Sequence, residues 1–315
     1  MNCDDDLGPV IPSQCYELRM YRWRRSRNRW QRLSEDYETG DEQTPTNFQL
    51  VTWNVNFDAP MPDKRMTKAL RYLEEDVFKC ENGEAPDPCV IMLQEVHVRA
   101  VAAILSDSWV REHFLLTPAD TSKWPTDALY GNITLVEKSI QVEKAHILQF
   151  GSSSMHRTGL IVDVRLEAPK PHEYDVILRL INTHLESLRV GDDVRPGQLK
   201  LLSKFLKGPG VRGGVVAGDM NPIGPSDAGL PAAYGLKDAW RKGDKDPKGF
   251  TWGEQPPAQF PAARFDKILY LPRKGYRVEP PERLGVGLKL FDDRLPNGIW
   301  TSDHYGLLST VEVLR

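Results

Sequence analysis

The chain has 315 residues, of which 40% are hydrophobic and 27% are charged, and its formal net charge is -3 at pH 7. A chain of this size can bury one large core or two smaller ones. Its apolar runs are shorter than the roughly 20 residues that cross a bilayer, so we expect no membrane partner. The small negative charge excludes a basic field over the whole molecule, so any nucleic-acid surface must be local.

The first residues, MNCDDDLGPVIPSQ, are acidic and lack the apolar region of a secretory signal. We therefore expect an intracellular protein, in the nucleus, the cytoplasm or both, and no feature of the sequence indicates an obligate protein partner. The cysteines lack the spacing of a zinc site or a disulfide framework, which predicts reduced thiols. They are Cys3, Cys15, Cys80 and Cys89.

Seven arginines lie between Arg19 and Arg32, interleaved with Tyr21, Trp23 and Trp30. Arginines between aromatic rings suit phosphate contact and base stacking. The same alternation also describes a solvated hairpin whose arginines only solubilise a sheet edge, and the sequence leaves both interpretations open. The acidic, turn-rich segment that follows predicts a linker. We therefore expect an N-terminal extension over residues 1–46 and the main domain over residues 47–315.

From residue 48 onward, apolar strands alternate with amphipathic helices. Helices are predicted at 63–79, 98–107 and 195–207, where apolar residues recur at helical spacing. Short apolar strands are predicted at 48–54, 89–96, 131–139, 144–150, 158–166, 175–185, 214–219, 264–271 and 305–314. Helices between only some of these strands predict an α/β fold with two mixed sheets packed together under helices, a four-layer αββα sandwich.

Polar side chains stand at or just after the ends of the apolar strands. The segments LVTWN, IMLQE, LINTH and VVAGDMN supply Asn54, Glu95, His184, Asp219 and Asn221. Each residue alone would be an ordinary turn former, but strand ends at one sheet edge converge in space, so the set predicts a single site. Carboxylates, amides and imidazoles suit a hard cation and a phosphate. The set includes no cysteine and no glycine-rich phosphate loop, which argues against thiol and P-loop chemistry.

The last predicted strand is preceded by Ser302, Asp303 and His304. A carboxylate that touches an imidazole fixes its tautomer and favours its protonated form, which suits catalysis. An Asp-His pair at a strand end can also be simple capping. The five polar strand ends favour the catalytic interpretation.

The ordered set TWN, LQE, THLES, GDMN, RFDKI and SDHYGL resembles the endonuclease/exonuclease/phosphatase superfamily. The element THLES, together with GLKDAW and GFTWGE, is similar to its branch of 5'-tyrosyl-DNA phosphodiesterases. The likeness runs from about Phe48 to Leu314, and everything before Phe48 lies outside it.

The resemblance implies a role for each polar strand end. Glu95 would hold one Mg2+, with Mn2+ as a substitute, because Mg2+ commonly binds through one or two carboxylates together with water and phosphate. Asn54 and Asn221 would donate hydrogen bonds to the phosphate, and Asp219 would deprotonate the attacking water. Asn56 stands where the branch has an aspartate that assists the metal, so metal binding is expected to be weaker unless another group compensates.

The two histidines complete the implied catalytic set. His304, held by Asp303, would stabilise the charge that develops on the phosphoryl oxygens. His184 would lie close by as a second donor.

Further residues are implied at the substrate side. Tyr130 and Trp252 match aromatic positions of the branch and would wall a DNA end by stacking, although core or rim packing explains Trp252 equally well. Ser187, in THLES, is expected to contact substrate. Ile223 stands where the branch carries an arginine near substrate, so one phosphate contact is missing.

By this resemblance, the chain would be a Mg2+-dependent phosphodiesterase that hydrolyses a phosphotyrosyl bond at a 5' DNA end in the repair of topoisomerase adducts. The DNA end would be single-stranded or frayed. Two alternatives stay open. One is the same catalytic set acting on RNA, nucleotides or another phosphoester, and the other is a non-catalytic nucleic-acid-binding module.

Overall fold

Seven strands form one sheet in the computed structural model, which describes residues 12–34, 37–39, 44–81, 83–171, 174–293 and 295–314. The order across the sheet is β1 (Gln14–Leu18), β8 (Gln141–Gln149), β9 (Thr158–Glu167), β10 (Asp175–His184), β11 (Gly213–Asp219), β13 (Asp266–Tyr270) and β12 (Lys237–Asp238). In this part of the chain β10 and β11 run parallel, and the other neighbours are antiparallel.

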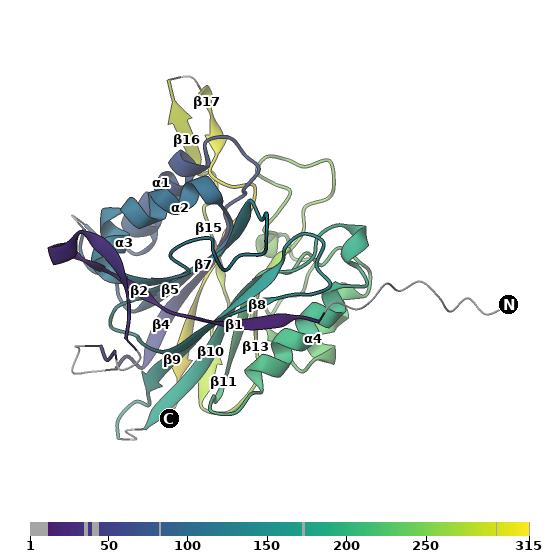
Figure 1. The fold of residues 1–315 in the computed structure, drawn as a ribbon. Helices are drawn as coiled ribbons and strands as arrows, with labels where there is room; N and C mark the ends of the chain where they lie inside the picture. Colours follow the sequence, from purple (N-terminus) through teal and green to yellow (C-terminus); the bar gives the residue numbers. More distant parts are fainter. Residues whose placement is uncertain are drawn as a thin grey trace.

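Nine strands form a second sheet. Its order is β14 (Tyr276–Val278), β18 (Gly306–Val313), β4 (Asn47–Asn54), β5 (Cys89–His97), β7 (Tyr130–Glu137), β6 (Phe114–Thr117), β2 (Tyr21–Arg24) and β3 (Arg29–Arg32), with β15 (Glu282–Leu284) also paired to β18. The strands β4 and β5 are parallel. A separate hairpin of β16 (Lys289–Asp292) and β17 (Leu295–Trp300) projects from the body of the molecule (Figure 1).

Helices lie outside both sheets (Figure 1). On the side of the nine-stranded sheet these are α1 (Pro62–Tyr72), continued by a π turn (Leu73–Val77), α2 (Val98–Ser106) and α3 (Ser108–His113). On the side of the seven-stranded sheet these are α4 (Arg195–Leu206) and the short α5 (Leu230–Ala233). Four 3-10 turns complete the helical elements in the described residues: Arg25–Arg27, Arg189–Gly191, Asp227–Gly229 and Pro247–Gly249. This arrangement confirms the predicted αββα sandwich.

The apolar pattern of the chain determines how the layers pack. In β10, Leu178 and Leu180 belong to the core between the sheets, whereas Ile181 packs with Leu199 and Leu202 of α4. Successive strand side chains point to opposite faces, so one strand serves both apolar layers. Each fully buried leucine stabilises the fold by about 1.5–3 kcal/mol. No helix in the described residues is long and apolar enough to span a membrane.

A polar pair also connects the two sheets. Gln94 of β5 donates from Nε2 to Asn182 Oδ1 of β10 at 2.8 Å. Asn182 Nδ2 in turn donates to the carbonyl oxygens of Leu93 at 3.1 Å and Ile133 at 3.0 Å. Buried amides are costly unless their hydrogen bonds are made, so this network fixes the offset between the sheets. Gln94 and Asn182 precede the polar strand ends, and the offset therefore positions the candidate site.

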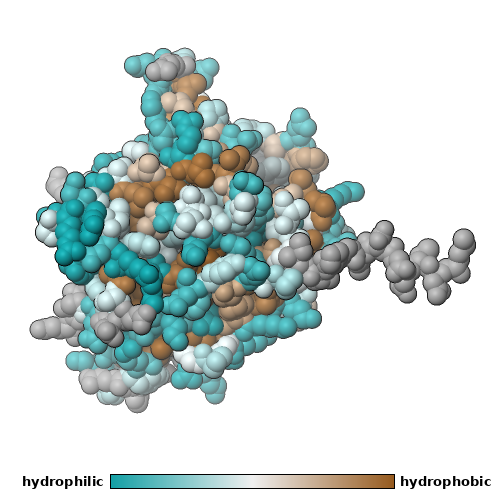
Figure 2. Space-filling view, viewed as in Figure 1, coloured by the Kyte–Doolittle hydropathy of each residue, from teal (hydrophilic) through white to brown (hydrophobic). Residues whose placement is uncertain are grey.

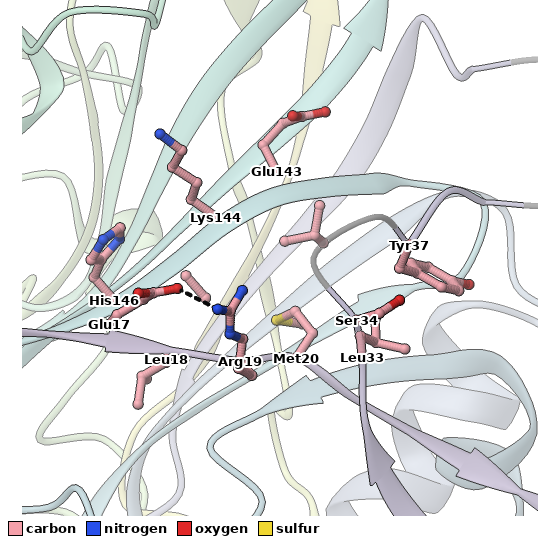
Figure 3. A pocket seen from close by; sticks show the side chains of 12 residues that line it. Glu17, Leu18, Arg19, Met20, Leu33, Ser34, Tyr37, Glu143, Lys144 and His146 are labelled. Carbon is pink, nitrogen blue, oxygen red and sulfur yellow. Dashed lines mark ion pairs between the residues drawn. The ribbon is translucent and has the colours of Figure 1, made fainter.

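The segment predicted as an N-terminal extension contributes strands to both sheets. Strand β1 pairs with β8, and β2 pairs with β6. Leu18, the last residue of β1, and Met20, between β1 and β2, are buried in the core. Strands β1 and β8, together with Leu33, Ser34 and Tyr37, line a hollow of about 460 Å3, in which Glu17 and Arg19 form an ion pair (Figure 3). The described cysteines, Cys15, Cys80 and Cys89, are free thiols as predicted, and Cys3 lies outside the described residues.

Candidate active site

Three neighbouring strands of the seven-stranded sheet bring polar residues into one row. His184 at the end of β10 lies opposite Asp219 at the end of β11, and Asp219 lies opposite Asp266 at the start of β13. The second sheet contributes Asn54 at the end of β4, whose Nδ2 donates to Asp219 Oδ2 at 3.1 Å. His184 Nε2 lies 3.3 Å from the same oxygen. The predicted convergence of Asn54, His184 and Asp219 is therefore confirmed.

Glu95 reaches the same region through a β-bulge. The register of β5 against β7 shifts between Leu93 and Val96, and Glu95 has a φ of +56°. A bulge re-aims a side chain, and the left-handed backbone of a non-glycine residue costs energy that the surroundings must support. Glu95 Oε2 accepts a hydrogen bond from the Phe57 amide at 3.0 Å, and its Oε1 lies 3.6 Å from His184 Nδ1.

The turn after β11 shapes the base of the site. Asn221 has a φ of +44°, and its backbone amide donates to Asp219 Oδ1 at 3.0 Å. The Asn221 side chain is also held, because its Nδ2 donates to the Leu185 carbonyl at 3.1 Å and its Oδ1 accepts from Ser187 Oγ at 3.1 Å. Ser187 therefore lies beside the site and positions Asn221.

His304 is held by a different carboxylate from the one predicted. Its Nδ1 lies 2.7 Å from Asp266 Oδ2, whereas Asp303 Oδ2 accepts a hydrogen bond from the indole of Trp252 at 3.2 Å. The prediction that Asp303 holds His304 is wrong. The reason is geometric, since Asp303 lies at a bend and faces Trp252, whereas Asp266 reaches His304 from β13. Asp266 belongs to the RFDKI motif, but the sequence pattern alone gives it no place in the site.

The segment before β18 is anchored to β4. Ser302 Oγ donates to the Asn54 carbonyl at 2.6 Å and accepts from the His304 amide at 3.0 Å. The Trp53 indole donates to the His304 carbonyl at 3.0 Å. These contacts fix His304 next to Asp219, with His304 Nε2 3.8 Å from Asp219 Oδ2.

A buried arginine outside the sequence motifs contacts His184. Arg157 Nη1 lies 2.7 Å from His184 Nδ1 and donates to the Tyr130 hydroxyl at 3.1 Å. A guanidinium donates only, so His184 Nδ1 accepts, and Nε2 carries the proton toward Asp219. Burial and the nearby Arg157 and His304 lower the pKa of His184 well below its ordinary value. No motif marks Arg157, because it comes from the loop before β9.

Asp219 and His304 have opposite electrostatic environments. Burial raises the pKa of Asp219 to about 7, with Asp266 adding to the shift and His304 opposing it. Burial lowers the pKa of His304, but Asp266, Asp303 and Asp219 outweigh burial and raise it well above the ordinary value. The site therefore pairs a carboxyl that titrates near neutrality with a charged imidazolium, the combination expected of a base and an electrostatic stabiliser.

The predicted substrate residues lie on two aromatic stacks beside the site. Tyr130 stacks on Phe57 with centroids 4.1 Å apart, and its hydroxyl donates to the Met155 carbonyl at 2.9 Å. Trp252 stacks on Phe265 at 4.9 Å with an interplanar angle of 7°. The sequence assigns no role to the stacked partners, although Phe57 follows Asn56 and Phe265 lies within the RFDKI motif.

The structure also shows the surroundings of the two residues that differ from the tyrosyl-DNA phosphodiesterase branch, Asn56 and Ile223. Asn56 has a φ of +55°, and its Oδ1 accepts hydrogen bonds from the amides of Asp58 at 3.0 Å and Ala59 at 3.2 Å. The side-chain oxygen of Asn56 therefore stabilises the loop that follows β4. Ile223, in the place of the expected arginine, is 38% exposed.

Known proteins resemble this chain over most of its length. The profile described as Endonuclease/Exonuclease/phosphatase family matches residues 51–304, most of the chain. This chain belongs to the endonuclease/exonuclease/phosphatase family. It is similar to tyrosyl-DNA phosphodiesterase 2 of Mus musculus, with 31% identity over 85% of this chain and 67% of the relative. The Bos taurus protein of that name is 26% identical over 96% of this chain and 78% of the relative.

Solved structures of the family have the same fold. A truncated tyrosyl-DNA phosphodiesterase 2 from Caenorhabditis elegans gives a TM-score of 0.61 at 22% identity, covering 84% of this chain and 97% of that one. The D. rerio enzyme complexed with a single-stranded DNA product gives a TM-score of 0.62 at 21% identity, covering 85% of this chain and 99% of that one. The chain is thus a phosphodiesterase of the endonuclease/exonuclease/phosphatase family, a hydrolase of phosphoester bonds.

Enzymes of this family generally depend on a divalent metal, and the donor set at Glu95 fits one. Its carboxylate, which the bulge directs into the site, supplies the hard oxygen ligand that divalent cations of this kind bind. A second cluster, Asp219, Asp266 and His304, also brings three potential ligand atoms within 4.8 Å of one another. His304 does not suit a ligand there, because metal ligation needs a neutral imidazole and three carboxylates keep this one charged.

Proposed function

We propose that this protein is a Mg2+-dependent phosphodiesterase that hydrolyses the phosphotyrosyl bond at a 5' DNA end, in the repair of topoisomerase adducts. The observation that carries the proposal is Asp219, a carboxyl whose pKa is about 7, set between neutral His184 and charged His304. The names of the relatives support the substrate class.

The first step assigned to the chain is activation of water. Asp219 has its base form available near neutral pH, which is the condition for efficient general base catalysis. Asn54 and His184 both donate toward Asp219 Oδ2, and the Asn221 amide donates to Oδ1, so the carboxylate cannot rotate. Asp219 accepts a proton from the water molecule while the water oxygen attacks phosphorus. The bond from phosphorus to the tyrosyl oxygen then breaks.

The second requirement is to stabilise the negative charge that develops on the phosphoryl oxygens. The imidazolium of His304, held by Asp266, supplies a fixed positive charge and an Nε2 donor in a buried site, where such a charge acts strongly. A Mg2+ held by Glu95 would neutralise further negative charge on the phosphate and on the departing oxygen. The tyrosyl oxygen leaves with the bonding electron pair and takes a proton from solvent, so the products are free tyrosine and DNA with a 5'-phosphate.

The two aromatic stacks support a single-stranded or frayed end. Tyr130 on Phe57 and Trp252 on Phe265 offer ring surfaces on which unpaired bases can stack. The D. rerio relative, solved with a single-stranded DNA product, supports the same class of substrate.

A second candidate function is the same chemistry on RNA, nucleotides or another phosphoester. The exposed Ile223 favours it, since an isoleucine cannot provide the phosphate contact that an arginine would make at this position.

A panel of phosphoesters tests both candidates. Purified protein is assayed on 5'- and 3'-phosphotyrosyl oligonucleotides, RNA, nucleotides and a phosphoinositide, with Mg2+, with Mn2+ and with EDTA. We expect turnover on the 5'-phosphotyrosyl end with either metal and almost none with EDTA or with Glu95→Gln. Full turnover in EDTA would rule out the metal-dependent scheme, and preference for another phosphoester would favour the second candidate.

A further inference from the structure

The hairpin of β2 and β3 separates its aromatic side chains from its basic ones. Trp23 lies opposite Trp30, and Arg24 lies opposite Arg29. Because successive strand residues point to opposite faces, the two tryptophans share one face and the two arginines share the other, which we call the arginine face, together with Arg22.

The tryptophan face is fixed to the body of the molecule. Trp23 and Trp30 pack edge to face at 5.8 Å, and the Trp30 indole donates to the Leu105 carbonyl of α2 at 2.9 Å. The Arg111 guanidinium of α3 lies 3.9 Å from the centre of the Trp23 ring. With one face anchored to α2 and α3, the hairpin holds the arginine face in a fixed orientation.

The arginine face borders a hollow of about 350 Å3. Its lining residues are Arg22, Arg24, Gln31, Arg32, Leu33, Ser34 and Tyr37. Three guanidinium groups and no carboxylate line this hollow within the described ranges. Arg22 lies 5.0 Å from the centre of the Tyr37 ring, a stacked cation that is still able to donate at its edge.

The charges of this hollow are not balanced in the described part of the chain. No carboxylate described there forms an ion pair with Arg22, Arg24, Arg29 or Arg32. Like charges directly opposite in a sheet are destabilising, so the Arg24 and Arg29 pair costs stability unless an anion binds between them. The neighbouring hollow of Figure 3 differs, because Arg19 pairs with Glu17 and Glu143 pairs with Arg165.

We propose that the arginine face binds the phosphate backbone of a nucleic acid strand, as a docking surface separate from the catalytic residues. Arginine forks match phosphate oxygens, and the face is local and strongly basic on a chain of net charge -3. Figure 2 shows the hydrophilic surface over this hairpin at the left edge of the molecule. The choice of nucleic acid over other polyanions rests on the proposed function.

The test is a salt titration of oligonucleotide binding. A fluorescein-labelled single strand with a 5'-hydroxyl is titrated in EDTA by fluorescence anisotropy with the full chain and with Arg24→Gln/Arg29→Gln. For a single strand, each lost phosphate contact lowers the slope of log affinity against log salt by about 0.7. The matched control is Lys200→Gln/Lys204→Gln on the exposed side of α4, which removes the same charge elsewhere.

We expect the arginine variant to bind more weakly with a slope lower by about 1.4, and the lysine control to match the unaltered protein. Equal slopes for the arginine variant and the unaltered protein would overturn the proposal. Poly-glutamate or phosphatidylserine vesicles serve as competitors. If binding of these competitors depends on Arg24 and Arg29 while binding of the oligonucleotide does not, the partner is another polyanion and the assignment to nucleic acid is wrong.

A second readout keeps this proposal apart from the proposed function. Hydrolysis of the p-nitrophenyl ester of thymidine 5'-phosphate, which is too small to reach the hairpin, should be equal in both variants. A protein that loses oligonucleotide binding through the arginine variant but hydrolyses no phosphoester would support the docking surface and contradict the proposed function.

Discussion

At the scale of single residues, Asp219 links turnover to stability. Its ordinary pKa is 3.8 and its folded pKa is about 7, so the folded chain prefers the protonated carboxyl. The stabilisation from protonation is complete below the ordinary pKa and is lost as the pH rises through about 7. Asp219→Asn removes this titration. The free energy of unfolding, measured in urea with EDTA from pH 5 to pH 8, should fall more steeply in the unaltered protein than in the variant.

The same substitution should also lower turnover by about a hundredfold to ten-thousandfold, because asparagine cannot accept the proton of water. Affinity for a non-hydrolysable substrate should hold or improve, since a negative charge facing phosphate is gone. Parallel pH dependence of stability in both proteins, or near-normal turnover in the variant, would contradict the role of Asp219 as base.

The partner of His304 gives a second prediction at this scale. Asp266→Asn should lower the pKa of His304, so turnover should decrease more at pH 8 than at pH 6, where the imidazole stays charged. Asp303→Asn should have a smaller effect, since Asp303 is hydrogen-bonded to Trp252. Titration of the His304 ring protons by NMR, beside the pH profile of kcat, checks the assignment. A larger loss of turnover from Asp303→Asn than from Asp266→Asn would support the pairing of Asp303 with His304 that the sequence predicts.

At the scale of elements, we expect the loop after β4 to influence how tightly a metal at Glu95 is held. Asn56 Oδ1 caps this loop through the amides of Asp58 and Ala59, and an aspartate oxygen can accept the same hydrogen bonds. Asn56→Asp should therefore keep the loop and add a carboxylate near Glu95, lowering the Mg2+ concentration for half-maximal rate. Asn56→Ala is the control, because it removes the cap and adds no charge. An unchanged Mg2+ titration in Asn56→Asp would show that the loop does not reach the metal.

Elements were predicted well where the pattern of apolar residues is local. The strands that end in Asn54, His184 and Asp219 are short apolar runs, and their polar ends converge as expected. Contacts between distant segments were not predictable in the same way. The Asp266 and His304 pair depends on β13 and β18 lying in different sheets that face each other, and Asp303 was misleading because it is adjacent only in sequence.

At the scale of the whole molecule, the N-terminal segment holds the two sheets together at one edge. Met20 is 5% exposed between β1 and β2, so Met20→Ala should cost about 2–5 kcal/mol of unfolding free energy. Val190→Ala, at a position 65% exposed, is the control and should change stability by less than about 0.5 kcal/mol. Equal urea midpoints for both variants would mean that residues before Asn47 form the separable extension that the sequence suggested.

The proposed reaction is hydrolysis at phosphorus of a 5'-phosphotyrosyl DNA end. The most direct measurement is a single-turnover reaction on such an oligonucleotide in water enriched in oxygen-18, with Mg2+ present and the products resolved by mass spectrometry. We expect one heavy oxygen to enter the 5'-phosphate of the DNA and free tyrosine to carry none. Release of phosphotyrosine with a 5'-hydroxyl end, internal cleavage of the strand, or heavy oxygen in tyrosine would contradict the proposed reaction.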